Sequence, residues 1–127
     1  MSKRVEVRDT ILSWLKSAFP DIAWSTMHKG AQRGSSITGS LVNDRISYTY
    51  DTKNSLVAKA EYYIILIDPN NMDTVDALAD GGFELLDSDD LDGVAIESYV
   101  REVIYGAAPQ KADAGAVMLR YEVFYYV

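Results

Sequence analysis

Few side chains in this 127-residue chain could do chemistry, because it has one histidine and no cysteine. Without cysteine there can be no disulfide, no thiolate metal ligand and no thiol nucleophile. A single histidine, His28, cannot build a histidine-rich metal site. Catalysis needs a nucleophile, a base or a metal centre. We therefore interpret His28 as a solvated residue at a strand end, and we predict a non-enzymatic protein with no catalytic residue, cofactor or metal.

An acidic segment, residues 87–93, shares some features with a calcium-binding loop. Alternating acids followed by a glycine resemble the start of an EF-hand. The register is wrong, however, because Ser98 stands where the bidentate glutamate would be. We interpret the segment as a solvated or partner-facing turn, and its acids are Asp87, Asp89, Asp90 and Asp92.

A basic segment, residues 29–36, contains two glycines but lacks the phosphate-binding pattern GxxxxGK[ST], and no helix obviously follows it. We interpret it as a loop whose cations, Lys29 and Arg33, could contact an acidic partner or DNA.

The charges are divided unevenly along the chain. Most of the 12 lysines and arginines lie in residues 1–60, most of the 19 acids lie in residues 61–127, and the net charge is −7. An acidic chain is a poor general binder of nucleic acid, because phosphate contacts need clustered cations. Halves of opposite sign could instead attract a second copy of the chain.

Two helices are expected to position these groups. Apolar residues recur every three or four positions from Val7 to Phe19, which predicts an amphipathic helix that ends at Pro20. The polar run 68–71 offers a cap for a second helix, and Gly81-Gly82 is expected to end it, followed by a short apolar patch.

The rest of the chain shows the period-two alternation of strands. A polar turn at 51–54 predicts an antiparallel hairpin between its two flanking strands. The expected strands are 22–28, a possible edge strand at 35–42 that Gly39 weakens, 45–51, 55–67, 94–105 and 116–127.

These elements predict a single domain, residues 1–127, of the α+β class. We expect an antiparallel sheet of about four to six strands with both helices packed on one face.

The longest strongly apolar run, residues 62–67, is far too short to cross a bilayer, and the N-terminus does not read as a secretion signal. The sequence therefore predicts a protein made in the cytoplasm and not inserted in a membrane.

This layout resembles the tail terminator and minor tail proteins of long-tailed bacteriophages and prophages. Four features carry the resemblance: the helix ending in Phe19-Pro20-Asp21, the hairpin with RISYTY and AEYYIILI, Gly81-Gly82-Phe83 after the second helix, and the aromatic last strand MLRYEVFYYV. The resemblance implies a virion tail subunit, assembled in the host cytoplasm. It also implies a ring, commonly a hexamer, that stops growth of the tail tube at its head-proximal end. Its partners would be the major tail tube protein and a head-completion protein.

A ring uses heterologous interfaces, in which one patch meets a different patch on the next subunit. The candidate interface pairs three cations with four acids across subunits: Lys29, Arg33 and Arg45 with Asp87, Asp89, Asp90 and Asp92. Alternatively, the acidic segment faces the tail lumen, where repulsion would help DNA slide past. Two other functions stay open, namely a head–tail joining protein and a small cytoplasmic domain that binds a metal or ligand.

Overall fold

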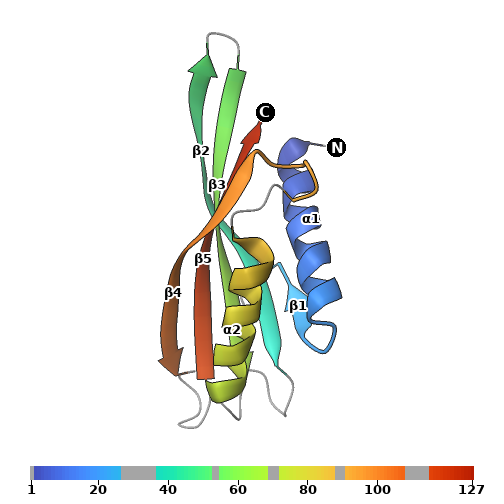
Figure 1. The fold of residues 1–127 in the computed structure, drawn as a ribbon, viewed down its shortest axis with the longest axis vertical. Helices are drawn as coiled ribbons and strands as arrows, with labels where there is room; N and C mark the ends of the chain where they lie inside the picture. Colours follow the sequence, from blue (N-terminus) through green and yellow to red (C-terminus); the bar gives the residue numbers. More distant parts are fainter. Residues whose placement is uncertain (1, 27–36, 53–54, 69–71, 88–90, 108–114) are drawn as a thin grey trace.

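The computed structural model describes residues 2–26, 37–52, 55–68, 72–87, 91–107 and 115–127. In these ranges one helix precedes three strands, and a second helix precedes two more strands (Figure 1). In chain order they are α1 (Lys3–Ala18), β1 (Ala23–Ser25), β2 (Thr38–Thr52), β3 (Ser55–Asp68), α2 (Met72–Leu86), β4 (Glu97–Ala107) and β5 (Gly115–Tyr126). None of the helices in these ranges is long and apolar enough to cross a membrane.

The five strands form one sheet in the order β1-β2-β3-β5-β4. The α+β class is confirmed, and the predicted hairpin is the β2–β3 pair. The sheet is mixed rather than purely antiparallel, because β1 runs parallel to β2. Short links favour antiparallel pairs, whereas a parallel pair needs about a dozen connecting residues, which residues 26–37 provide.

The first helix follows the prediction closely. The side chain of Ser2 accepts a hydrogen bond from the backbone N–H of Val5, which caps the first turn. At the other end, the N–H of Phe19 donates to the carbonyl of Leu15 just before Pro20. Val7, Ile11 and Leu15 are completely or almost completely buried, so the predicted apolar stripe faces the core.

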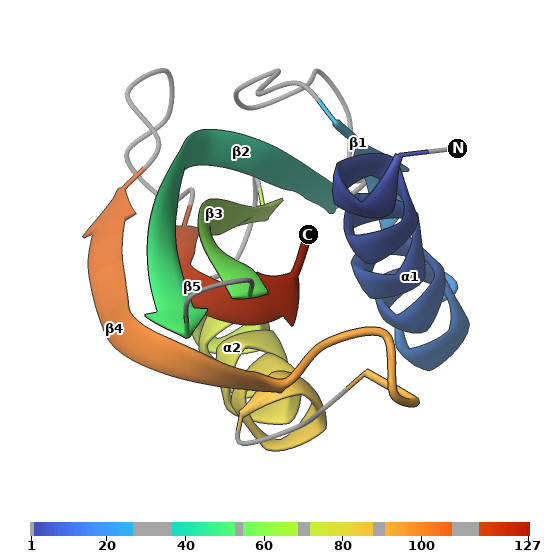
Figure 2. The same cartoon turned by 90° about the horizontal axis from the view of Figure 1, so that it is seen from above.

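The core lies on one face of the sheet, which curves around the two helices (Figure 2). Alternate residues of β3 and β5 oppose one another in register on this inner face, and all are 2% exposed or less. The pairs are Ala58–Tyr125, Ala60–Val123, Tyr62–Tyr121, Ile64–Leu119 and Leu66–Val117. This confirms a sheet with both helices packed against the same face.

The second helix does not end at Gly81-Gly82 as expected. It continues to Leu86, so the predicted apolar patch is its last turn. A side chain at Gly82 would place a Cβ 3.0 Å from a methyl carbon of Leu119, and one at Gly81 would lie 3.2 Å from the ring of Phe19. The glycines therefore allow close packing. Complete burial of Leu86, of the order of 2 kcal/mol, offsets their poor helix propensity.

The predicted edge strand at 35–42 lies partly outside the described residues, and its part Thr38–Ser40 is covered by β1 and is not at the edge. From Thr38 it joins the strand predicted at 45–51 to form β2, with a register shift between Asn43 and Arg45. Gly39 pairs with Trp24 of β1, and a Cβ at Gly39 would lie only 2.5 Å from the indole ring. Glycine thus allows the tryptophan ring to approach the strand closely. The strand propensity of glycine does not indicate this contact, because Trp24 is distant in sequence.

Candidate functional site

Three of the seven candidate interface residues lie in the described part of the chain: Arg45, Asp87 and Asp92. Arg45 belongs to β2, while the two aspartates lie in the connection between α2 and β4. Strands β2 and β4 are separated by β3 and β5 in the sheet. The fold therefore does not bring these charges together within one chain. Lys29, Arg33, Asp89 and Asp90, together with His28 and the basic loop 29–36, lie outside the described residues.

Arg45 is free to reach a partner. Its side chain is 68% exposed, and its Nε lies 3.5 Å from a carboxylate oxygen of Glu61. A long contact to such an exposed group contributes at most a few tenths of a kcal/mol, because water screens it. The guanidinium of Arg45 could therefore reach a neighbouring subunit while Arg120, 3.1 Å away, stays paired with Glu61.

Asp87 contacts its own chain. Its carboxylate accepts a hydrogen bond of 2.9 Å from the backbone N–H of Val100 in β4. This contact fixes the end of α2 to the strand that follows it. Asp87 therefore has a structural partner within its own chain.

The end of the acidic segment is anchored by Leu91. This residue and Asp92 adopt positive φ angles of 54° and 58°, and Gly93 follows at 84°. A left-handed conformation costs leucine roughly 1–2 kcal/mol, which its complete burial offsets. Asp92 stays exposed at the surface. The described residues contain no cluster of three or more histidine, cysteine, aspartate or glutamate side chains suited to a metal.

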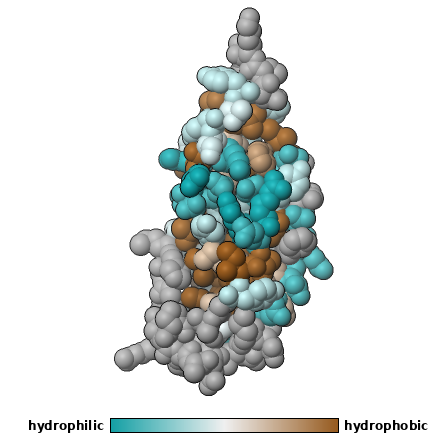
Figure 3. All heavy atoms as spheres, turned by 90° about the vertical axis from the view of Figure 1, so that its left-hand side faces the viewer, coloured by the Kyte–Doolittle hydropathy of each residue, from teal (hydrophilic) through white to brown (hydrophobic). Residues whose placement is uncertain are grey.

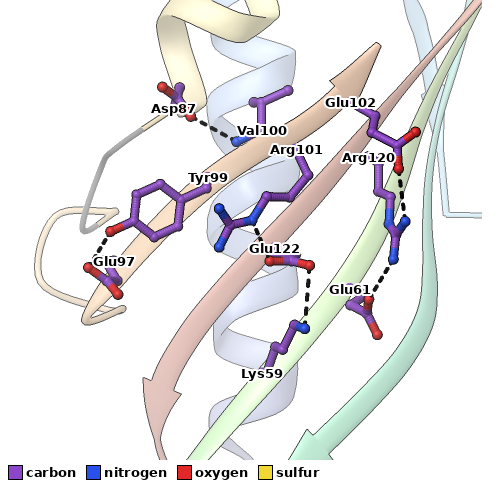
Figure 4. Close-up of polar contacts among 10 residues, drawn as sticks. All are labelled: Lys59, Glu61, Asp87, Glu97, Tyr99, Val100, Arg101, Glu102, Arg120 and Glu122. Atoms are coloured by element: carbon purple, nitrogen blue, oxygen red, sulfur yellow. Dashed lines mark hydrogen bonds and ion pairs between the residues drawn. The ribbon is translucent and has the colours of Figure 1, made fainter. Parts of the chain in front are cut away.

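Charged residues cross the outer face of the sheet, opposite the helices, in an arrangement that sequence reasoning missed. We call it the polar belt (Figure 4). Its two central carboxylates are Glu61 and Glu122, which are only 5% and 6% exposed and pair in register. The belt contains Arg45, Lys59, Glu61, Arg101, Glu102, Arg120 and Glu122.

Each buried carboxylate has two cationic partners. Arg120 lies 3.1 Å from Glu61 and 2.9 Å from Glu102, and Arg45 completes the set around Glu61. Glu122 lies 2.6 Å from Arg101 and 3.4 Å from Lys59. The belt thereby links all four long strands.

The cations decide the protonation state of Glu122. Burial is the largest single influence and raises its pKa. Hydrogen bonds and charge from Arg101 and Lys59 together outweigh burial, so the pKa of Glu122 is lower than its ordinary value. Hydrogen bonds to Glu61 and Glu102 likewise raise the pKa of Arg120. Glu122 and Arg120 are therefore both charged at neutral pH.

The sequence did contain a signal for the belt. Lys59 and Glu61, and likewise Arg120 and Glu122, are charged pairs two residues apart in otherwise apolar strands. Such spacing places both members of a pair on the same face. The two pairs meet only because β3 and β5 are neighbours in the sheet. The sequence pattern does not show this, because α2 and β4 lie between the two strands in the chain.

Apolar groups lie on the outer face on both sides of the belt (Figure 3). Toward one end of the sheet, Ile67 is buried against Ile65 and Ala116, while Ile104 of β4 is 44% exposed. The large apolar side chains exposed elsewhere are Tyr48, Tyr50, Ile96, Tyr105, Tyr126 and Val127. Several of them lie on β2 and β4, where partners could approach.

Comparisons with known proteins add a likeness of fold. No protein-family model matches the chain, and no curated protein is similar to it in sequence. A chain in the solved structure described as the virion of the native gene transfer agent (GTA) particle superimposes with a TM-score of 0.72. The match covers 95% of each chain at 14% sequence identity. At this identity the likeness shows a shared fold.

Proposed function

We propose that this chain is a structural subunit of a phage or prophage particle and acts as a tail terminator. The observation that carries the proposal is the fold shared with a virion chain over nearly the full length of both proteins. In this role the chain forms a ring, with six subunits as the resemblance implies, at the head-proximal end of the tail tube.

The candidate interface fits such a ring. Arg45 lies on β2, near one edge of the sheet, and Asp92 lies in the connection that leads into β4 at the other edge; both side chains are exposed. Subunits that meet side to side would therefore bring opposite charges together at every interface. Asp87 would support this contact indirectly, because it holds the acidic turn against β4. Lys29, Arg33, Asp89 and Asp90 complete the proposed interface.

Tube growth tests the role of the chain. Purified chain is mixed with the major tail protein of the same phage or prophage, and tube length is measured by electron microscopy. A terminator binds one end of each tube and keeps the tubes short. A head–tail joining protein would leave tube length unchanged, and that outcome would overturn the proposal.

Charge reversal tests the interface separately. Arg45→Glu should reduce ring formation measured by light scattering, because it places like charges across the contact. Lys16→Glu is the control, since Lys16 is an exposed cation in the last turn of α1. Equal ring formation by both variants and the unmodified chain would exclude Arg45 from the interface.

A further inference from the structure

Helix α1 carries two arginines on the side that faces the sheet. Arg4 precedes Ile11 by seven positions, and Arg8 precedes Leu15 by the same number. Because seven residues make almost two helical turns, each arginine lies on the same side of α1 as a buried core residue. The stripe that buries apolar side chains in the second half of α1 therefore directs two cations toward the sheet in the first half.

Strand β2 carries a polar side chain on its inner face. Asn43 is the register partner of Tyr62, which is buried in the core, so the two side chains lie on the same face. The adjacent inner-face residues of β2 are apolar, namely Leu41 and Ile46. A register shift follows Asn43, and bulges of this kind are enriched next to functional sites. Asn43 thus presents an amide on a face that is otherwise apolar nearby.

The two arginines and the asparagine meet at one hollow. It lies between α1 and β2 and has a volume of about 180 Å³. A single water molecule needs roughly 15 Å³ by the same measure, so a polyatomic ion fits. Among the described residues the lining contains two cations and an amide but no acid: Arg4, Val5, Arg8 and Asn43.

The positive charge at the hollow is only partly compensated. The carboxylate of Asp9 accepts hydrogen bonds of 3.2 and 3.1 Å from Nε and Nη2 of Arg8, which leaves its Nη1 outside this contact. Within the described part of the chain, Arg4 forms no ion pair. One guanidinium at the hollow therefore has no counter-charge, and its N–H groups are available to an acceptor.

A buried hydroxyl lies close to the same arginines. Tyr62 is completely buried, and its hydroxyl has no hydrogen-bond partner in the ranges that the structure describes. Burial is the largest influence on the pKa of Tyr62 and raises it, whereas the charges of Arg8 and Arg4 act in the opposite direction. Both guanidiniums are therefore near this hydroxyl. A place rich in donors and poor in acceptors favours a ligand with several anionic oxygens.

We propose that this hollow binds a phosphate group, free or as a monoester, through Arg4, Arg8 and Asn43. Such a group carries a charge of about −1.5 to −2 at pH 7, and its oxygens match the N–H forks of two guanidiniums at once. A carboxylate carries a single charge, and Asp9 already supplies one to Arg8. Binding at this hollow does not require a ring, so it goes beyond the structural role proposed above.

A titration of the unmodified chain tests the ligand. Inorganic phosphate is added at constant ionic strength, and the Nε–H signals of the arginines are followed by NMR. The signals of Arg4 and Arg8 should shift and saturate, whereas acetate at the same ionic strength should leave them in place. No saturable shift with phosphate, or an equal response to acetate, would overturn the proposal.

Two variants of α1 separate a specific site from net charge. Arg4→Gln should weaken phosphate binding at least about tenfold, because hydrogen bonds from a charged group are lost. Lys16→Gln is the matched control: it removes the same charge from the same helix, at a second hollow where Asp9 offers an opposite charge. Equal weakening by both variants would show that only the net charge matters and would overturn the site.

A substitution in β2 tests the other side of the hollow. Asn43→Asp keeps the size of an exposed side chain but places a carboxylate against the phosphate, so binding should be lost. Ser47→Asp is the control, because it adds the same charge at an exposed position of the same strand. Equal phosphate binding by these two variants would exclude Asn43 from the site.

An oligonucleotide without terminal phosphates identifies the source of the phosphate group. All its phosphates are diesters with a single charge, so it should bind more weakly than inorganic phosphate. Binding as tight as that of inorganic phosphate, and lost in Arg4→Gln, would assign the hollow to nucleic acid and overturn a site for free phosphate or a monoester.

Discussion

Glu61 of β3 and Glu122 of β5 are register partners on the outer face of the sheet, and both are almost completely buried. Two carboxylates directly opposite each other repel, so this arrangement is stable only because cations surround it. Arg45 and Arg120 form ion pairs with Glu61, while Lys59 and Arg101 form ion pairs with Glu122. The fold thus depends on a charge pattern that extends over four strands.

Removing the charge of Glu122 should destabilise the protein. Glu122→Gln keeps the size of the side chain but weakens its contacts with Lys59 and Arg101. Hydrogen bonds to charged groups contribute about 1.5–3 kcal/mol, so the free energy of unfolding in urea should fall by about that amount. Glu102→Gln is the control, because its side chain is 51% exposed and should lose less than about 1 kcal/mol. Similar losses in both variants would contradict a special role for the buried carboxylate.

Ionisation of Glu122 should make the free energy of unfolding depend on pH. The pKa of Glu122 is lower in the folded protein than in the unfolded chain, where it is about 4.3. Its contribution is therefore fully present above pH 4.3 and is lost as the pH falls through the lower, folded pKa. Urea midpoints measured from pH 7 to pH 3 should fall less steeply in Glu122→Gln than in the unmodified chain. Parallel curves would show that Glu122 does not contribute to this dependence.

Gly39 should not tolerate a side chain. In Gly39→Ala the new methyl group would lie 2.5 Å from the ring of Trp24 and 2.9 Å from Ile22, so β1 must shift. Overpacking of this kind costs about 1–3 kcal/mol, and the fluorescence of Trp24 should change with it. Ser47→Ala on the exposed part of β2 is the control and should change neither quantity. An unchanged stability in Gly39→Ala would show that β1 moves freely.

Tyr62 should be replaceable by phenylalanine without loss. Its side chain is completely buried, and its hydroxyl has no hydrogen-bond partner among the described residues. Because an unsatisfied buried polar group is costly, Tyr62→Phe should leave the free energy of unfolding unchanged or raise it by up to about 1 kcal/mol. Burial also raises the pKa of Tyr62, so the unmodified residue should ionise only in strong alkali. A clear loss of stability in the variant would reveal a partner for the hydroxyl.

The sequence by itself determined the elements whose residues carry a local pattern. The spacing from Val7 to Leu15 defined α1 and its buried side, and alternation from Leu56 to Leu66 defined β3 and its inner face. Proline at position 20 correctly marked the end of α1. These predictions succeeded because burial of a periodic apolar face depends on residues close together in the chain.

Only the tertiary structure decided the features that need distant partners. Helix α2 continues past Gly82 because the last turn buries Leu86, and Gly39 is needed because Trp24 of β1 packs against it. The polar belt exists because β5 lies beside β3, which brings Glu122 opposite Glu61. Local spacing specifies the face on which a side chain lies, whereas strand order and register specify which side chains meet, and those are set by packing of the whole chain.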